Sequence, residues 1–555
     1  MKLSSSEQEK FGGYGLLVIM LLVFFGLLLK NAGLFPFIFG DEYTYSLHSR
    51  LLPLSESPIP GYLYLAVYRL TNHCEVDFLG CARTFNAFFF VCAAPFIYLI
   101  CRRMMAVLPA LCIALCALLA PINAYTAHYM PEALYFFGFW AFIWALTRAR
   151  IEVWQDWLVA GLLLGCSSLI KPHSMLFIPA ATLYIGYVSI AGHQGRLLLA
   201  ARNLGLFFIA AALAKFALSY ALAGPAGLTL FGTSYNKIAS NAGGLERVIQ
   251  LTSLALKSLQ GHLLGICLGM GLALAATVHL SIQTIFTRRP LGDAEKFAVL
   301  SALIVANLVL ATSLFSATVI GVSPNESIYR VHARYYDFAF PMLWMVVASV
   351  LSRVDVSAPR KWRAVLAVMV AAAIIYALIN AMAPYEPSII DSPELEGLLF
   401  DKTSFYLIAA AGLLTLVAWV YRQRAGATLF VYLALPLTVI VSSYWVTQEQ
   451  RIHLTPTPLD RAGTFTRQYL DEQQRAATVL VGADMGALMN AAFYLSIPRP
   501  WPFLIARDIA YDFQGLAPEL EWMLSIGDYV PPADGRLQMR MPGFTLTKIH
   551  PASEQ

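Results

Sequence analysis

The sequence predicts an all-α polytopic membrane protein that ends in a small α/β domain. Three observations carry this prediction: an apolar composition, repeated apolar runs of bilayer length, and a different residue pattern near the carboxy terminus. The chain has 555 residues, 58% of them hydrophobic and 13% charged, and its mean hydropathy is +0.64. Soluble domains have about 25% charged residues. Most of the mass therefore belongs in the bilayer, and a net charge of +5 gives no reason to expect a nucleic-acid partner.

The first apolar run begins near Gly13 and reads GYGLLVIMLLVFFGLLLKNAGLF. A signal peptide has a shorter apolar core that is followed by a small-residue cleavage site. Here NAGLFPFIF follows instead. We expect this run to be retained as a membrane anchor.

Further runs long enough to cross a bilayer, about 20 residues each, occupy most of the chain up to residue 446. Proline and glycine divide several of them, so the number of spans is set only to within about one. About thirteen spans are predicted, centred near residues 24, 93, 113, 140, 163, 182, 211, 272, 307, 344, 374, 412 and 436.

Basic residues mark every second connection between these spans, whereas the turn at residues 121–131 has none. By the positive-inside rule the amino terminus is cytoplasmic, and an odd number of spans then places residues 447–555 outside. We expect a multi-pass protein of the bacterial inner membrane with a periplasmic or extracytoplasmic C-terminal domain. The basic residues of the cytoplasmic segments are Lys2, Lys10, Arg102, Arg103, Arg148, Arg150, Arg196, Arg202, Arg288, Arg289, Lys296, Arg353, Arg360, Lys361, Arg363, Arg422 and Arg424.

Residues 447–555 have the pattern of a small α/β domain, distinct from the membrane module at residues 1–446. ATVLVGAD is typical of a buried strand and MGALMNAAFYL of a helix. EWMLSIGDYV and GFTLTKIH indicate further strands, and proline clusters (IPRPWP, VPPADG) separate the elements. VLVGAD lacks a GxGxxG continuation, so no dinucleotide site is predicted there.

The eight cysteines show no metal-binding spacing, and six of them sit inside apolar runs as small hydrophobic residues. Cys74 and Cys81 differ because they lie in the first outer loop. If that loop faces an oxidising compartment, they can form a disulfide. The sequence leaves this pairing open.

Charged and polar residues gather at the outer ends of spans in four places, two of which carry carboxylates. The first outer loop, residues 37–81, opens with FIFGDEYTYSLHSR and continues into SESPIPGYLYLAVYRL, which suits a helix lying at the interface. The second place reads NAYTAHYMPEALYFF. There Pro131 suits the first helical turn and Glu132 favours a helix amino terminus.

The other two places carry cations. SSLIKPHS puts Lys171 and His173 at an outer end, and NESIYRVHARYYDFAFP puts a basic cluster just before a span. Each place alone has an ordinary explanation, because acids cap helices and Lys, Arg and Tyr snorkel at the interface. Since acids and bases converge on one face, and ionisable groups at membrane depth mark function, we favour their joint use in one site.

Transfer of a sugar from a lipid phosphate to a hydroxyl needs this combination of groups. The phosphate departs as an anion and requires cations nearby, and the acceptor hydroxyl requires a carboxylate that removes its proton. A polyprenyl tail requires an apolar groove among helices. Two rivals stay open. A ligase or polymerase of lipid-linked glycans uses similar groups on the same face, whereas a transporter usually binds its substrate near the midplane, where charges are scarce in this chain.

At these residues the chain resembles the GT-C superfamily of polyprenyl-phosphate-sugar-dependent glycosyltransferases. It is most similar in pattern to the branch that contains protein O-mannosyltransferases and the lipid A aminoarabinose transferase. The likeness covers residues 1–350 and is architectural beyond them, where the span number and the outer C-terminal domain agree with the aminoarabinose transferase. The motifs that carry it are GDEYTYS, GYLYLAVYRL, HYMPEAL, LGCSSLIKPHSMLFIP and ARYYDFAFP.

The resemblance implies roles for the clustered residues. Asp41 corresponds to the catalytic acid of the family's first outer loop, with Glu42 beside it, and Glu132 corresponds to the acid of the second loop. With Asp41 as the base the reaction is inverting, and Glu42 either shares that role or orients the loop. The candidates for contacting the donor phosphate are Lys171, Arg334, His332 and Arg330. Support for the acceptor and the loop is expected from Tyr43, Tyr45, His48, His173 and Tyr335.

The expected partners are a polyprenyl-phosphate sugar donor, membrane lipid, and an acceptor that is a cell-envelope glycan, lipid or protein. No spacing typical of metal ligands stands out, and Lys and Arg alone can neutralise a lipid phosphate. We therefore expect no obligatory cofactor. Some relatives in the superfamily use a divalent metal, which leaves that alternative open.

Overall fold

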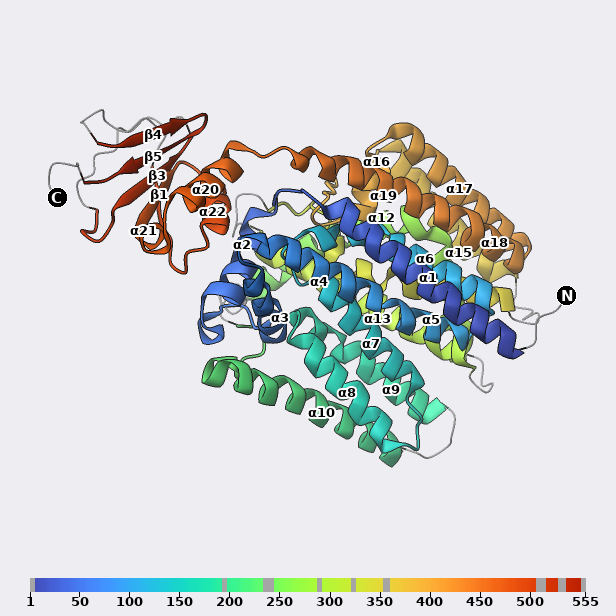
Figure 1. The fold of residues 1–555 in the computed structure, drawn as a ribbon. Helices are drawn as coiled ribbons and strands as arrows, with labels where there is room; N and C mark the ends of the chain where they lie inside the picture. The colour runs from blue at the N-terminus through green and yellow to red at the C-terminus, as the bar shows by residue number, and fades with distance from the viewer. Residues whose placement is uncertain are drawn as a thin grey trace.

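The computed structural model describes residues 5–191, 197–232, 244–286, 292–320, 326–352, 360–505, 516–527 and 536–550. Over these residues the chain is a bundle of helices with a small sheet domain at one end (Figure 1). The amino-terminal end of the first helix lies at the opposite end of the bundle (Figure 1). The predicted fold class is confirmed.

The bundle is built from long apolar helices joined by short helices at their ends. The longer helices are α1 (Ser5–Asn31), α4 (Phe78–Cys92), α5 (Ala94–Arg102), α6 (Val107–Leu119), α7 (Glu132–Arg148), α8 (Trp154–Ser168), α9 (Ile178–Ala191), α10 (Leu197–Ala223), α12 (Gly244–Phe286), α13 (Asp293–Val319), α14 (Phe340–Ser349), α15 (Arg360–Ile379), α17 (Lys402–Tyr421) and α19 (Leu435–Arg451). The short ones are α2 (Phe39–Ser46), α3 (Tyr62–Tyr68), α16 (Pro393–Leu399) and α18 (Gln423–Leu429).

In the described ranges, nine helical segments are long and apolar enough to cross a membrane. A tenth is added if α6 and the bent turn Pro121–Ala127 form one span. The predicted span centres lie in helices, except residue 93, which lies at the break between α4 and α5. Three of those helices fall outside these ten segments and are shorter than the roughly 20 residues that cross a bilayer: α7 has 17 residues, α8 has 15 and α14 has 10. The count of thirteen spans stays a prediction.

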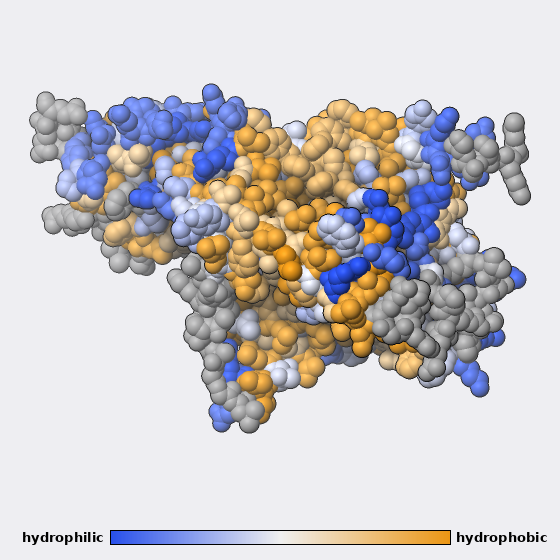
Figure 2. All heavy atoms as spheres, turned by 90° about the horizontal axis from the view of Figure 1, so that it is seen from below, coloured by the Kyte–Doolittle hydropathy of each residue, from blue (hydrophilic) through white to orange (hydrophobic). Residues whose placement is uncertain are grey.

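The surface of the bundle is apolar in its middle part. Figure 2 shows hydrophobic atoms over the bundle and hydrophilic atoms on the sheet domain and at the opposite end. α1 leaves Leu17, Leu22 and Phe25 exposed, as expected of a helix that is apolar all round and faces lipid. By contrast, α14 is buried along its whole length. Peripheral helices therefore face lipid while α14 lies in the protein interior.

The C-terminal domain has a five-stranded sheet in the order β2-β1-β3-β5-β4. β1 pairs in parallel with β2 and β3, whereas β5 runs antiparallel to β3 and β4. β1 is buried on both faces, because Leu480 packs into one apolar cluster while Val479 and Val481 pack into another. Its elements are α20 (Pro458–Tyr469), α21 (Glu472–Ala476), β1 (Thr478–Gly482), α22 (Met485–Leu495), β2 (Trp501–Leu504), β3 (Trp522–Ile526), β4 (Gln538–Met541) and β5 (Phe544–Lys548).

The predicted strand, helix and two further strands of this domain correspond to β1, α22, β3 and β5. Two strands were not predicted. β2 contains Pro502, inside a proline cluster that was interpreted as a separator. A proline is tolerated there because β2 is an edge strand, and the backbone groups on its outer edge have no neighbouring strand to pair with. The other edge strand, β4, is short and has a polar sequence, Gln-Met-Arg-Met.

The C-terminal domain packs on the first outer loop. Figure 1 shows α22 beside α2, and the ring centroids of Phe493 and Phe78 are 5.1 Å apart. Arg50 donates from Nη2 to the Ser496 hydroxyl at 3.1 Å. The expected boundary at residues 446 and 447 falls within α19, which continues to Arg451. The domain therefore sits against the helix that carries Asp41.

Candidate active site

Glu42 fixes the loop that carries Asp41. Its side chain is buried, and its two carboxylate oxygens accept the backbone N–H groups of Phe37 at 3.2 Å, Ile38 at 3.1 Å and Tyr129 at 3.0 Å. Burial opposes ionisation, but His128, 3.7 Å away, and the backbone amides outweigh it and hold the pKa of Glu42 below its usual value. Because these contacts occupy both oxygens of Glu42, we favour the loop-orienting role for Glu42 over the catalytic one.

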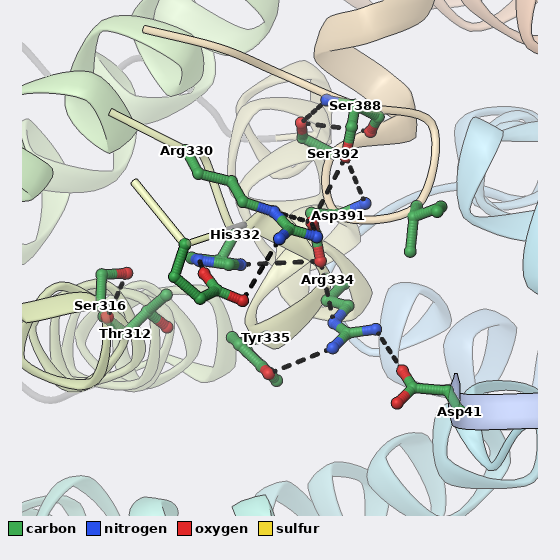
Figure 3. Close-up of polar contacts among 12 residues, drawn as sticks. Asp41, Thr312, Ser316, Arg330, His332, Arg334, Tyr335, Ser388, Asp391 and Ser392 are labelled. Carbon is green, nitrogen blue, oxygen red and sulfur yellow. Dashed lines mark hydrogen bonds and ion pairs between the residues drawn. The ribbon is translucent and has the colours of Figure 1, made fainter. Parts of the chain in front are cut away.

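Asp41 precedes Glu42 on α2, and its side chain points toward Arg334 (Figure 3). Its side chain is 41% exposed, and its Oδ2 lies 2.9 Å from Nη1 of Arg334 (Figure 3). The two residues are 293 positions apart in sequence. The structure thus brings together the acid of the first predicted cluster and a cation of the fourth.

Arg334 is anchored by Asp391, in the loop between α15 and α16. The Arg334 backbone N–H donates to the Asp391 carbonyl oxygen at 2.7 Å. Nε of Arg334 lies 3.1 Å from Oδ1 of Asp391, close enough for an ion pair although the N–H is not aligned for a hydrogen bond. Arg330 donates from Nε to the other oxygen of Asp391 at 2.6 Å. Two arginines therefore share one fully buried carboxylate.

His332 completes this cluster. Its Nε2 lies 3.4 Å from Glu326 and its Nδ1 lies 3.6 Å from Asp391. Burial lowers the pKa of His332, but the nearby carboxylates of Asp391 and Glu326 outweigh it, so the pKa is raised. The pKa of Asp391 is held well below its usual range because Arg334, His332 and Arg330 outweigh the effect of burial. His332 and Arg330 therefore support Arg334 through Asp391.

Lys171 and Glu132 form a buried ion pair beside this cluster. Nζ of Lys171 lies 2.9 Å from Oε1 of Glu132, and their side chains are only 5% and 7% exposed. Nζ also lies 5.3 Å from the ring centroid of Tyr335, and the Arg334 guanidinium carbon lies 5.3 Å from the same ring. His173 stacks on Tyr335 with centroids 4.5 Å apart. Tyr335 is thus in contact with both predicted phosphate-binding cations.

An apolar cavity of about 170 Å³ opens against these residues. His173 and Tyr335 form its polar edge, and Leu176, Phe231 and Phe315 belong to its apolar lining. Because Tyr335 lines this cavity and also contacts both cations, the cavity suits a lipid that carries a phosphate.

Three predicted support residues lie away from this site. Tyr43 packs between the bundle core and the core of the C-terminal domain, and Tyr45 packs edge-on against Tyr64 with centroids 5.3 Å apart. His48 is buried in a π-helical turn, where burial lowers its pKa. Among the described contacts, none joins His48 to Asp41. The loop also contains a disulfide between Cys74 and Cys81.

Two acids of the site were not predicted from the sequence, Asp391 and Glu326. Asp391 stands in SIIDSPELEG, a short polar segment between two apolar helices, and nothing in that segment marks it as a partner of Arg334. Within the described ranges, no group of three or more His, Cys, Asp or Glu residues is arranged to hold a metal ion. Whether the reaction needs a metal therefore stays a prediction.

Comparison with known proteins gives one family match and several similar folds. Residues 55–220 match the family described as dolichyl-phosphate-mannose-protein mannosyltransferase, a stretch that includes Glu132 and Lys171. The fold matches that of ArnT from Cupriavidus metallidurans bound to undecaprenyl phosphate, with a TM-score of 0.52 over 97% of this chain and 98% of that one, at 12% identity. The family match covers under a third of the chain, and the likeness to ArnT, which extends over nearly the whole chain, is one of fold.

Two further solved structures match with lower TM-scores. ArnT from the same organism in the apo state matches with a TM-score of 0.49 at 13% identity, over 96% of this chain and 97% of that one. An oligosaccharyltransferase from Archaeoglobus fulgidus matches with a TM-score of 0.45 at 11% identity, over 94% of this chain and 70% of that one. No curated protein matches the sequence significantly.

Proposed function

We propose that this chain is a GT-C enzyme that transfers a sugar from a polyprenyl-phosphate donor to an acceptor hydroxyl on the outer face of the membrane, with inversion at the anomeric carbon. The observation that carries the proposal is the meeting of Asp41 and Arg334 at 2.9 Å. A partly exposed carboxylate and a phosphate-binding cation are there side by side, which is where acceptor and donor must meet.

In this mechanism each charged residue of the site has a separate role. Arg334 and Lys171 bind the phosphate of the donor and neutralise the charge that grows on it as the glycosidic bond breaks. Asp41 takes the proton of the acceptor hydroxyl, which attacks the anomeric carbon from the face opposite the phosphate. Glu132 holds Lys171 in place through their 2.9 Å ion pair. The apolar cavity beside Tyr335 takes part of the polyprenyl chain.

The acceptor is proposed as a glycan, lipid or protein of the cell envelope, and the enzyme as a resident of the bacterial inner membrane. No obligatory metal is proposed, because two cations already face the phosphate position. Activity should therefore survive exhaustive chelation, and a loss of activity that added Mg²⁺ or Mn²⁺ restores would contradict this part.

The test uses the full chain in nanodiscs with undecaprenyl-phosphate sugars labelled in the sugar, together with fractionated cell envelopes as acceptor. Transfer of label, with the opposite anomeric configuration in the product by NMR, is the expected result. Use of undecaprenyl-diphosphate glycans but not of the monophosphates would favour a ligase or polymerase instead. Uptake of solute without chemical change would favour a transporter.

A further inference from the structure

Arg334 lies between two carboxylates that differ greatly in burial (Figure 3). On its inner side Asp391, whose side chain is fully buried, lies 3.1 Å from Nε and fixes the Arg334 backbone N–H at 2.7 Å. On its outer side Asp41, with 41% of its side chain exposed, lies 2.9 Å from Nη1. The inner contact uses Nε and the backbone, whereas the outer contact uses the end of the guanidinium group.

The inner contact is hard to exchange. Asp391 also accepts a hydrogen bond from Nε of Arg330 at 2.6 Å and one from the Ser388 hydroxyl at 3.3 Å, and it lies 3.6 Å from His332. Removing this carboxylate would leave several buried groups without their partner, which is strongly unfavourable. The cluster therefore fixes the inner side of Arg334.

The outer contact is easy to exchange. Among the described residues, Arg334 provides the only polar side-chain contact of Asp41. Partly exposed ion pairs contribute little free energy because water and salt screen them. An incoming dianionic or monoanionic phosphate carries more oxygen acceptors than one carboxylate, and it suits the paired N–H groups of a guanidinium end.

The end of Arg334 that Asp41 occupies faces the place where a phosphate would bind. Nη2 lies 3.4 Å from the Tyr335 hydroxyl, and the centroid of the Tyr335 ring lies 5.3 Å from the guanidinium carbon of Arg334 and 5.3 Å from Nζ of Lys171. The apolar cavity begins at the same tyrosine. A phosphate that binds both end nitrogens of Arg334, Nη1 and Nη2, would therefore compete with Asp41 for Nη1.

We propose that Asp391 is a positioning residue that keeps Arg334 in place while the donor phosphate replaces Asp41 on Nη1, so that donor binding frees the Asp41 carboxylate to act on the acceptor. This inference rests on the proposed function and deepens it. While Nη1 of Arg334 donates to Oδ2 of Asp41, that oxygen is not available to the acceptor hydroxyl. The donor consequently binds first and activates the base, and the acceptor follows.

The test measures the affinity of the full chain in nanodiscs for undecaprenyl phosphate, with undecaprenol as the control for the lipid chain. Asp41→Asn removes the competitor and should bind undecaprenyl phosphate about 2–5-fold more tightly, the range expected for a partly exposed ion pair. Asp391→Asn loses the anchor of Arg334 and should bind it about tenfold more weakly, since charge-assisted hydrogen bonds are the strong ones. The matched control is Asp156→Asn, which breaks the 2.8 Å pair with Arg150 outside the site and should change nothing.

A second measurement separates positioning from general structural damage. In an Arg334→Gln background, Asp391→Asn should cause no further loss of affinity, because it acts through Arg334. Asp391→Glu, which retains the charge, should recover part of the affinity. If Asp391→Asn does not fold, the affinity of Asp41→Asn for undecaprenyl phosphate still tests the exchange on Nη1. Asp41 is partly exposed, so its replacement leaves the buried cluster intact.

Each outcome bears on a different statement. Wild-type protein that binds undecaprenol as well as undecaprenyl phosphate would overturn the proposed function and this inference with it. Wild-type protein that prefers the phosphate, together with unchanged or weaker binding by Asp41→Asn, would overturn the inference alone. An equal loss from Asp391→Asn with and without Arg334 would overturn the positioning role.

Discussion

Replacing Lys171 with methionine tests whether its ion pair serves folding, donor binding or both. Lys171 and Glu132 lie 2.9 Å apart and are almost completely buried. At an effective dielectric constant of about 20, two charges at this distance attract each other by about 6 kcal/mol, before the cost of burying them. Lys171→Met would leave Glu132 buried without a counter-charge, so the free energy of unfolding should fall by about 3–5 kcal/mol.

A double variant separates the two roles. Lys171→Met/Glu132→Gln removes both charges, and it should recover most of the lost stability because no uncompensated charge stays buried. Its turnover should stay reduced by about 10²-fold or more, since the leaving phosphate still lacks one of its cations. Thermal unfolding in detergent and sugar transfer from an undecaprenyl-phosphate donor measure the two effects. Near-normal turnover in the double variant would refute the phosphate-binding role and leave Lys171 as a structural partner of Glu132.

Three further predictions concern other parts of the molecule. Arg334→Lys should not restore donor affinity fully, because the compact ammonium group cannot reach both Asp391 and a phosphate as the wider planar guanidinium does; binding of undecaprenyl phosphate measures this. His332 has a raised pKa in the folded protein, so its stabilising contribution is complete below the unfolded pKa of about 6.5 and is lost as the pH rises through the folded pKa. Unfolding curves between pH 5 and about 9 should show this loss in the wild type and not in His332→Gln. A reporter active only in the cytoplasm, fused after residue 555, should be silent, and a bright fusion would mean that the span count is wrong by one.

The sequence predicted those features of the site that depend on local patterns. An apolar run followed by Asp41 and Glu42, or a span that ends in Lys171, is visible without any knowledge of tertiary contacts. Charge asymmetry then indicated that these ends share one face. The structure agrees to the extent that Asp41 meets Arg334 and Glu132 meets Lys171.

What the sequence could not predict depends on long-range pairing. Asp391 looks like any acid in a loop, and only the fold brings it 3.1 Å from Arg334. Adjacent acids likewise look equivalent in sequence, yet Glu42 accepts backbone N–H groups while Asp41 points to a cation, because successive helical residues point in different directions. β2 was missed for a similar reason, since only its edge position makes Pro502 acceptable.

The rate of sugar transfer by Asp41→Asn in a single turnover, with the donor already bound, tests the central claim most directly. Asparagine has nearly the size of aspartate but cannot take up a proton usefully near neutral pH. General-base catalysis typically contributes about 10²–10⁴-fold, so the rate should fall by at least that order while the donor still binds. A rate close to that of the wild type would contradict the claim that Asp41 is the base.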